Sequence, residues 1–259
     1  MVSLTTEVRT DPVGPRRSAL RRWLEKFYRK HLRYPLWRLQ HPRAPFHAYY
    51  VDLVGGKLAR GRSHRALGTD YRETAESYFL GVLRHFGLRP EHVLLDYGCG
   101  SLRLGKHAIA YLDPGNYVGL DITDLFFKAG LEVLDPVLLS ARQPRLAVIG
   151  EGSPGLLRER PADFVACWHV ISKVPERELP DFFRSLLAHM GPRTRALIQV
   201  STGRRREKKG LVSWRAPVES YVEVLRRVAP DMATNVHVLP AELTGEGGLT
   251  VLEVRRADG

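Results

Sequence analysis

Short apolar runs alternate with longer amphipathic segments through most of this 259-residue chain. Short runs bounded by glycine, proline or acidic residues are typical of buried strands, and apolar spacings of three and four residues indicate helices. We expect strands at residues 93–95, 117–120, 145–149, 163–168 and 195–200. We expect helices at residues 71–87, 101–111, 125–134, 176–190 and 218–228. Strands that alternate with helices predict a mostly parallel sheet with helices on its faces.

The last two apolar segments form a different pattern. Residues 235–239 and 249–254 follow each other without an intervening long helical pattern, and the glycine-rich segment 245–248 connects them. Two apolar runs with such a connection indicate an antiparallel hairpin. We therefore expect the parallel sheet to end in an antiparallel pair.

The first seventy residues differ from the rest. Residues 1–16 are polar and lack periodicity, so we expect them to be disordered. Between residues 18 and 32 apolar side chains repeat at helical spacing among arginines and lysines, which predicts a basic amphipathic helix that ends at Pro35. Further prolines predict an irregular segment after it. The expected organisation is an extension over residues 1–70 and an α/β domain over residues 71–259.

Charge supports this division. The extension carries fifteen Lys and Arg against five Asp and Glu, a net charge of +10, whereas the remaining residues are close to neutral at +2. The two cysteines, Cys99 and Cys167, are too few for a disulfide framework, and no run of eighteen apolar residues occurs. We expect a cytoplasmic protein that at most contacts the inner face of the membrane.

A glycine-rich turn follows the first expected strand, in the sequence LLDYGCGSLRLG over residues 94–105. Gly98 and Gly100 allow the backbone to turn sharply and to approach a ligand, and Ser101 is placed to cap the following helix. A strand, a glycine loop and a helix N-terminus together are typical of a cofactor site. The sequence therefore predicts a cofactor site at the end of this strand.

Two features oppose a dinucleotide in that site. The dinucleotide fingerprint needs a third glycine where this chain has Arg103, and Asp96 would repel a pyrophosphate. A carboxylate at Asp96 suits a cationic ligand instead. Asp121 ends the second strand, 25 residues after Asp96, where an acidic residue is placed to accept hydrogen bonds from ribose hydroxyls.

With Asp96, Gly98, Gly100 and Asp121, the chain resembles the class I S-adenosylmethionine-dependent methyltransferases, whose first motif is an acidic residue followed by x-Gly-x-Gly. The resemblance runs from about residue 71 to residue 256. It implies S-adenosylmethionine as cofactor and a Rossmann-like, seven-stranded, mostly parallel sheet with an antiparallel C-terminal hairpin. The motif sequences look like those of a bacterial branch of methyltransferases for small molecules and the sugars of glycolipids.

The cofactor residues follow from the motif and from the resemblance. The expected set is Asp96, Gly98, Cys99, Gly100, Ser101, Arg103, Asp121, Ile122 and Glu151. Arg103 could meet the cofactor carboxylate through charge-assisted hydrogen bonds or lie in solvent. Glu151 follows the third strand, where the superfamily often presents a polar residue to adenine. Cys99 is expected to contribute its backbone and not a nucleophile.

Methyl transfer to a hydroxyl needs alignment of the two reactants and benefits from a base. His169 ends the fourth strand and could take the proton, or it could shape the pocket through its hydrogen bonds. Many related enzymes carry a histidine where this chain has Lys173. We name Lys173, Tyr71 and Trp214 as candidate substrate contacts. No Cys/His cluster has the spacing of a zinc site, so no metal is expected.

Aromatic residues of the extension provide further candidates. His47, Tyr49 and Tyr50 could fold over the mouth of the substrate site or pack on the surface.

The resemblance and the basic amphipathic helix predict methyl transfer to a hydroxyl of a small molecule, namely a sugar of a glycolipid or glycoside or a secondary metabolite. The alternative is an RNA methyltransferase in which the extension and residues 204–209 follow the phosphate backbone. The chain lacks an RNA-binding module and the Asn-Pro-Pro-Tyr-like or paired-cysteine motifs of such enzymes. Protein methylation, a non-enzymatic binding role and packing of the extension on a second copy in a homo-oligomer stay open.

Overall fold

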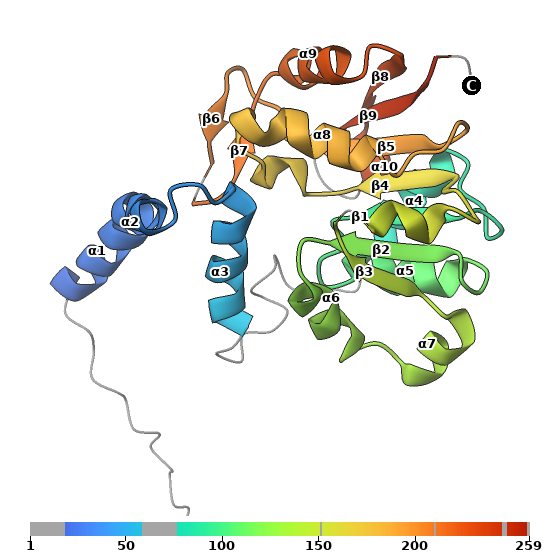
Figure 1. Cartoon of the computed structure of the whole chain (residues 1–259), viewed down its shortest axis with the longest axis horizontal. Helices are drawn as coiled ribbons and strands as arrows, with labels where there is room; N and C mark the ends of the chain where they lie inside the picture. The colour runs from blue at the N-terminus through green and yellow to red at the C-terminus, as the bar shows by residue number, and fades with distance from the viewer. Residues whose placement is uncertain (1–18, 59–76, 151, 210, 245–247, 258–259) are drawn as a thin grey trace, which may run out of the picture. The chain divides into compact units, whose positions relative to one another are not determined.

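The computed structural model describes residues 19–58, 77–150, 152–209, 211–244 and 248–257. The chain divides into two compact units, Met1–Arg43 and Ala44–Gly259, and each is described by itself (Figure 1). The disorder expected for residues 1–16 lies outside the described residues. Among the described helices, none is both long and apolar enough to cross a membrane.

The smaller unit is helical. It contains α1 (Ala19–Phe27), a π-helical turn η1 (Tyr28–Leu32) and α2 (Arg33–Gln40). The prediction that Pro35 ends the helix is wrong. Pro35 lies in the first turn of α2, where a backbone N–H has no partner within the helix, so proline is tolerated there.

The larger unit begins with α3 (Phe46–Leu58), where the sequence predicted an irregular segment. Phe46, Tyr49, Leu53 and Val54 are buried and share one face of this helix, at spacings of three, four and one residues. The prolines before Phe46 conceal this pattern because they interrupt the periodicity just upstream. Helix α3 therefore packs with the α/β unit, although its residues fall within the predicted extension.

The larger unit is built on a seven-stranded sheet with the strand order β3-β2-β1-β4-β5-β9-β8 (Figure 1). Its strands are β1 (Leu94–Tyr97), β2 (Tyr117–Asp121), β3 (Arg145–Val148), β4 (Phe164–Cys167), β5 (Arg195–Val200), β8 (Met232–Leu239) and β9 (Leu249–Arg256). The first five are parallel, and β9 runs antiparallel to both β5 and β8. The predicted Rossmann-like sheet with an antiparallel C-terminal pair is confirmed.

Helices cover both faces of the sheet. They are α4 (Ser77–His85), α5 (Arg103–Tyr111), α6 (Asp124–Leu131), α7 (Pro136–Arg142), α8 (Leu179–Leu187), α9 (Val218–Val228) and α10 (Ala241–Thr244). Side chains of α8 and α9 pack on one face, and those of α4 and α5 pack on the other. Along β1, Leu94 points to the second face and Leu95 to the first, because side chains alternate along a strand. Because the helices lie on the two faces of the sheet, the candidate functional site forms at the carboxyl ends of the parallel strands.

Several small elements escaped prediction. Helix α7 has only seven residues, and α10 lies within the connection between β8 and β9. Short 3-10 turns occur at η3 (Ser153–Leu157), η4 (Ile171–Lys173) and η5 (Glu176–Glu178). A separate two-stranded ribbon is formed by β6 (Glu207–Lys208) and β7 (Trp214–Arg215).

Candidate functional site

Asp96 lies buried near the carboxyl end of the central strand β1. The hydroxyl of Tyr117 on β2 donates a hydrogen bond of 2.7 Å to Asp96. Gly105 leaves room for this hydroxyl, because a Cβ at position 105 would lie 2.7 Å from the Tyr117 hydroxyl oxygen. Burial raises the pKa of Asp96 to about 7, and the neighbouring charge of Asp121 acts in the same direction. A cation placed beside Asp96 would lower this pKa and stabilise the carboxylate.

The amides of the glycine loop are directed into the protein. The N–H groups of Gly98 and Cys99 donate to the carbonyl of Leu120 at 2.7 and 3.0 Å, and that of Gly100 donates to Asp121 at 2.7 Å. These three donors therefore do not form the open cradle that a pyrophosphate requires. The geometry supports the sequence argument against a dinucleotide.

The two glycines of the loop have different roles. Gly98 has a φ of +85°, and a Cβ there would lie 2.2 Å from Val170 Cγ2, so its place is fixed by packing against the segment after β4. Gly100 has a φ of +53°, and no atom lies within 4 Å of a Cβ built on it. The backbone at Gly100 thus borders open space, where a ligand can approach closely.

Asp121 closes the second strand and organises the loop. Its carboxylate accepts hydrogen bonds from the N–H groups of Gly100 and Ile122, both at 2.7 Å. Burial raises the pKa of Asp121 to about 6, and the two backbone hydrogen bonds oppose that rise. Asp96 and Asp121 are thus two buried carboxylates near one glycine loop.

Helix α5 starts differently from the prediction. Its N-cap is Leu102, which has a φ of +61°, and Ser101 does not cap the helix as expected. Ser101 is buried, and its carbonyl oxygen lies against α6, where a Cβ at Gly130 would come within 2.5 Å of it. Close packing between the loop and α6 therefore sets the start of α5.

Arg103, the first residue of α5, lies among the polar groups of the site. Its charge opposes the rise that burial causes in the pKa values of Asp96 and Tyr50, and it adds to the fall that burial causes in the pKa values of His169 and Lys173. The guanidinium is thus electrostatically coupled to residues from four different segments. Such a position suits an anionic group of a bound ligand.

His169 follows β4 in a left-handed backbone conformation with a φ of +58°, which is uncommon for a residue other than glycine. Its N–H donates to Gln199 Oε1 at 2.7 Å, and its Nε2 lies 3.4 Å from the Tyr78 hydroxyl. Burial lowers the pKa of His169 to about 4, with smaller effects from Arg103 and Lys173. The imidazole is therefore neutral near pH 7 and able to accept a proton.

A polar pocket of about 440 Å³ lies near the backbone of this histidine, whose N–H and carbonyl group are hydrogen-bonded to the lining residues Gln199 and Ser172. Hydroxyl and amide side chains dominate its wall; these are Ser172, Gln199, Ser201, Thr202, Ser213 and Thr250. Lys173 and Trp214, both predicted substrate contacts, also line it. Lys173 donates a hydrogen bond of 2.6 Å to Ser213, and burial and Arg103 lower its pKa.

Helix α3 contacts both sides of the site. At its start, the N–H of Phe46 donates to both carboxylate oxygens of Glu178 at 3.0 Å, and its ring meets Trp214 edge-on at 4.8 Å. One turn later, Tyr50 meets Phe126 of α6 edge-on at 6.0 Å. Burial raises the pKa of Tyr50 to about 12, and the charge of Asp121 adds to this rise.

Three of the residues at the site were not proposed from the sequence, namely Tyr78, Gln199 and Ser213. Tyr78 lies on α4 and Gln199 on β5, far in sequence from His169, so no local pattern links them. Each of these polar residues lies in an otherwise apolar segment, and this was the only feature of the sequence that could have indicated a role at the site. Tyr50 was considered as a cover, and its helical spacing with Phe46 supports that interpretation.

Comparison with known proteins identifies the family of this chain. A family model described as a methyltransferase domain matches residues 71–229. The chain belongs to this methyltransferase family. Its fold is that of the S-adenosylmethionine-binding methyltransferases. No curated protein matches the sequence.

Solved structures share the fold of this methyltransferase. Magnesium protoporphyrin IX methyltransferase from Synechocystis PCC 6803, with bound S-adenosylmethionine, is 15% identical with a TM-score of 0.50, over 91% of this chain and 96% of that one. The mitomycin 7-O-methyltransferase MmcR is 17% identical with a TM-score of 0.58, over 83% and 61%. The glycopeptide N-methyltransferase MtfA is 11% identical with a TM-score of 0.53, over 70% and 90%. These likenesses concern the fold.

The residues of the methyltransferase fit this cofactor. Its sulfonium and amino group are cationic, and Asp96 and Asp121 are buried carboxylates, of which Asp121 accepts a hydrogen bond from the N–H of Gly100, where the backbone borders open space. Cys99 is buried, which raises its pKa well above the usual value and keeps it a thiol. Two predicted contacts, Glu151 and Tyr71, lie outside the described residues. Within the described ranges, no group of three or more His, Cys, Asp or Glu could hold a metal ion.

Proposed function

We propose that this methyltransferase methylates a hydroxyl group of a small molecule, such as a sugar of a glycolipid or glycoside or a secondary metabolite. One observation carries the proposal. His169, whose imidazole is neutral near pH 7, is hydrogen-bonded through its backbone to Gln199 and Ser172, and both line a pocket that is rich in hydroxyl and amide groups and includes Trp214. Hydroxyl and amide groups pair with the hydroxyls of a sugar, and an indole packs against its ring.

The cofactor is assigned to the loop between β1 and α5. Asp121 would accept hydrogen bonds from the ribose hydroxyls, Asp96 would pair with the cationic amino group, and Arg103 would bind the carboxylate. The burial of both aspartates supports this assignment, because carboxylates with raised pKa values gain most from a cationic ligand. When bound, S-adenosylmethionine supplies an electrophilic methyl group on its sulfonium.

The remaining chemistry falls to the protein. Methyl transfer would form a bond from the acceptor oxygen to the methyl carbon, and the electron pair of the broken carbon–sulfur bond would stay on sulfur. His169 takes the proton that the acceptor hydroxyl loses. Its low pKa makes it a weak base, so alignment of the acceptor in the polar pocket supplies a large part of the rate.

The smaller unit supports a lipid-linked acceptor. Apolar side chains of α1 and η1 are exposed at helical spacing; they are Leu20, Trp23, Leu24, Phe27, Tyr28 and Leu32. Basic residues such as Arg22 and Lys26 lie between them. A helix with aromatic and leucine side chains on one face and cations on the other binds anionic lipid surfaces.

RNA methylation is the competing function, and the structure gives one argument against it. Of the basic run near β6, Arg206 pairs with Glu176 at 3.0 Å, and Arg205 approaches Glu207 at 4.0 Å. Carboxylates therefore neutralise part of the run that would follow a phosphate backbone.

A labelled-methyl screen tests the proposal. The intact protein is incubated with S-adenosylmethionine carrying a labelled methyl group and with lipid, glycoside and RNA fractions. Label in the lipid or glycoside fraction, lost with His169→Asn, is the expected result. Label in RNA alone would overturn the proposal in favour of the competing function.

A further inference from the structure

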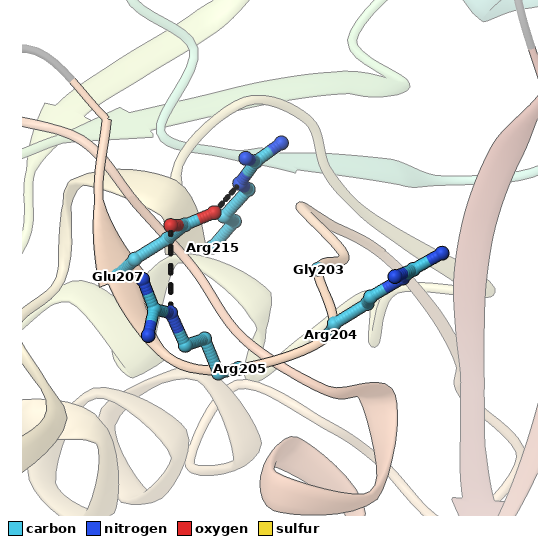
Figure 2. Close-up of a pocket in the computed structure, with 5 residues that line it drawn as sticks. All are labelled: Gly203, Arg204, Arg205, Glu207 and Arg215. Atoms are coloured by element: carbon cyan, nitrogen blue, oxygen red, sulfur yellow. Dashed lines mark hydrogen bonds and ion pairs between the residues drawn. The ribbon is translucent and has the colours of Figure 1, made fainter.

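A second hollow of the larger unit adjoins the polar pocket. It has a volume of about 590 Å³ and is lined by Gly203, Arg204, Arg205, Glu207 and Arg215 (Figure 2). We call it the arginine hollow. Arg215 lines both cavities, so the arginine hollow and the polar pocket are neighbours.

The two cavities have an excess of positive charge. Five cationic side chains line them, namely Lys173, Arg204, Arg205, Lys209 and Arg215. Glu207 is the single carboxylate among the described residues of both walls. One carboxylate cannot neutralise five cations, so the combined site attracts anions.

Glu207 divides the three arginines into two groups. It forms ion pairs with Arg215 and Arg205, which converge on it from two sides (Figure 2). Arg204 points away from Glu207 in the same view and makes no hydrogen bond or ion pair with any residue in the described part of the chain. Among the described residues, Glu207 therefore holds two of the three guanidinium groups in place and leaves the third, that of Arg204, outside this pairing.

The backbone around the arginine hollow is ordered by pairing. The N–H of Gly203 donates to the carbonyl of Ala216 at 3.1 Å, and Glu207 is paired with Arg215 in the β6–β7 ribbon. A Cβ at Gly203 would lie 3.0 Å from Arg215 Cδ, so this glycine leaves room for the arginine stem. The guanidinium groups are thus carried by a defined scaffold.

We propose that the arginine hollow binds a phosphate or carboxylate group of the acceptor, so that the enzyme selects an anionic acceptor. This inference rests on the proposed function and narrows its substrate class. Arginine forks form paired, charge-assisted hydrogen bonds with both groups. An anion held there would place the remainder of the acceptor in the adjoining polar pocket.

Calorimetry with the full chain tests this site without any methyl transfer. The probes are inorganic pyrophosphate, glucose 6-phosphate, glucuronate and glucose. Pyrophosphate and at least one of the two charged sugars should bind, whereas glucose should not bind at the same concentration. The charged sugar that binds more tightly shows whether the site prefers a phosphate or a carboxylate. Arg204→Ala should weaken pyrophosphate binding at least about tenfold. Glu207→Gln should strengthen it, because the carboxylate no longer competes for Arg205 and Arg215.

Arg226→Ala is the matched control, since it removes one exposed arginine from α9. It should leave pyrophosphate binding unchanged. The inference is wrong if none of the anions binds, if Arg204→Ala binds pyrophosphate like the wild type, or if Arg226→Ala weakens binding equally. Because these probes need no methyl donor, a failed acceptor screen and a failed anion site give separate results.

Discussion

Tyr117 and Asp96 form a buried pair in which the phenol donates a 2.7 Å hydrogen bond to the carboxylate. Tyr117→Phe removes the donor and leaves a buried carboxylate that lacks this partner. We expect the variant to lose about 1–3 kcal/mol of unfolding free energy in urea at pH 8. Tyr111→Phe, which removes a hydroxyl bonded to the Leu88 carbonyl at 3.1 Å, is the comparison. Equal losses in the two variants would contradict a special role for the buried pair.

The two buried carboxylates predict a pH dependence of cofactor binding. The folded-state pKa values of Asp121 and Asp96 are raised to about 6 and about 7, so both become charged as the pH rises from about 5 to about 8. A cationic cofactor should therefore bind more tightly at about pH 8. Calorimetry across this range should show the rise, and Asp96→Asn should flatten its upper part.

The same raised pKa values have the opposite effect on the free protein. A carboxyl group whose pKa is higher in the folded state contributes stability at low pH and loses it as the pH rises through the folded pKa. For Asp96 this loss extends from near 3.8 to about 7. Asp96→Asn cannot undergo this loss, so it should raise the free energy of unfolding in urea, relative to the wild type, more at pH 8 than at pH 5. An equal increase at both pH values would contradict the raised pKa.

His169 is predicted to affect turnover more than cofactor affinity. Asparagine tolerates the left-handed conformation at this position but cannot take the proton, so His169→Asn separates backbone strain from chemistry. We expect turnover to fall by about 10²-fold or more while the Kd for the cofactor changes little. With a pKa of about 4, the wild-type imidazole should cause no loss of turnover between about pH 6 and 8. Near-normal turnover in the variant would remove His169 from the proton transfer.

Tyr50 tests the contribution of α3 to the site. Tyr50→Ala removes the ring that meets Phe126, and an aromatic pair contributes about 0.5–1.5 kcal/mol beyond its buried area. Cofactor affinity should fall several-fold in calorimetry. Tyr50→Phe keeps the ring and should retain most of the affinity. If both variants bind like the wild type, α3 does not contribute to the cofactor site.

Lipid binding by the smaller unit has a direct test. The full chain should sediment with vesicles that contain anionic phospholipid and stay in solution with purely zwitterionic ones. Trp23→Ala combined with Phe27→Ala removes two stacked, exposed rings and should abolish sedimentation. Val238→Ala, at an exposed position of β8, is the control and should sediment like the wild type. Undiminished binding by the double variant would exclude this surface.

Local patterns were enough to predict the sheet and the glycine loop that follows β1. The apolar runs that end at Asp96 and Asp121 are short-range signals, and parallel strands bring their carboxyl ends to one edge. The cap at Ser101 was predicted wrongly because the packing of Gly130 against the loop, a contact distant in sequence, sets where α5 begins.

Contacts between distant segments account for what the sequence left open. The approach of Tyr78 to His169 spans 91 residues, and the bond from Phe46 to Glu178 spans 132. Neither can be inferred from spacing along the chain. The same holds for the arginine hollow, because Arg204 and Arg215 come to line one cavity through the pairing of β6 with β7 and of Gly203 with Ala216.

The most direct test of the account is a calorimetric titration of S-adenosylmethionine into the wild type, Asp121→Ala and Asp124→Ala at pH 8. Asp124 lies three residues further on, is exposed to solvent more than Asp121, and pairs with Lys128. The account predicts that Asp121→Ala weakens binding at least about tenfold, whereas Asp124→Ala binds like the wild type. Equal affinity in all three proteins would contradict the cofactor site at the ends of β1 and β2.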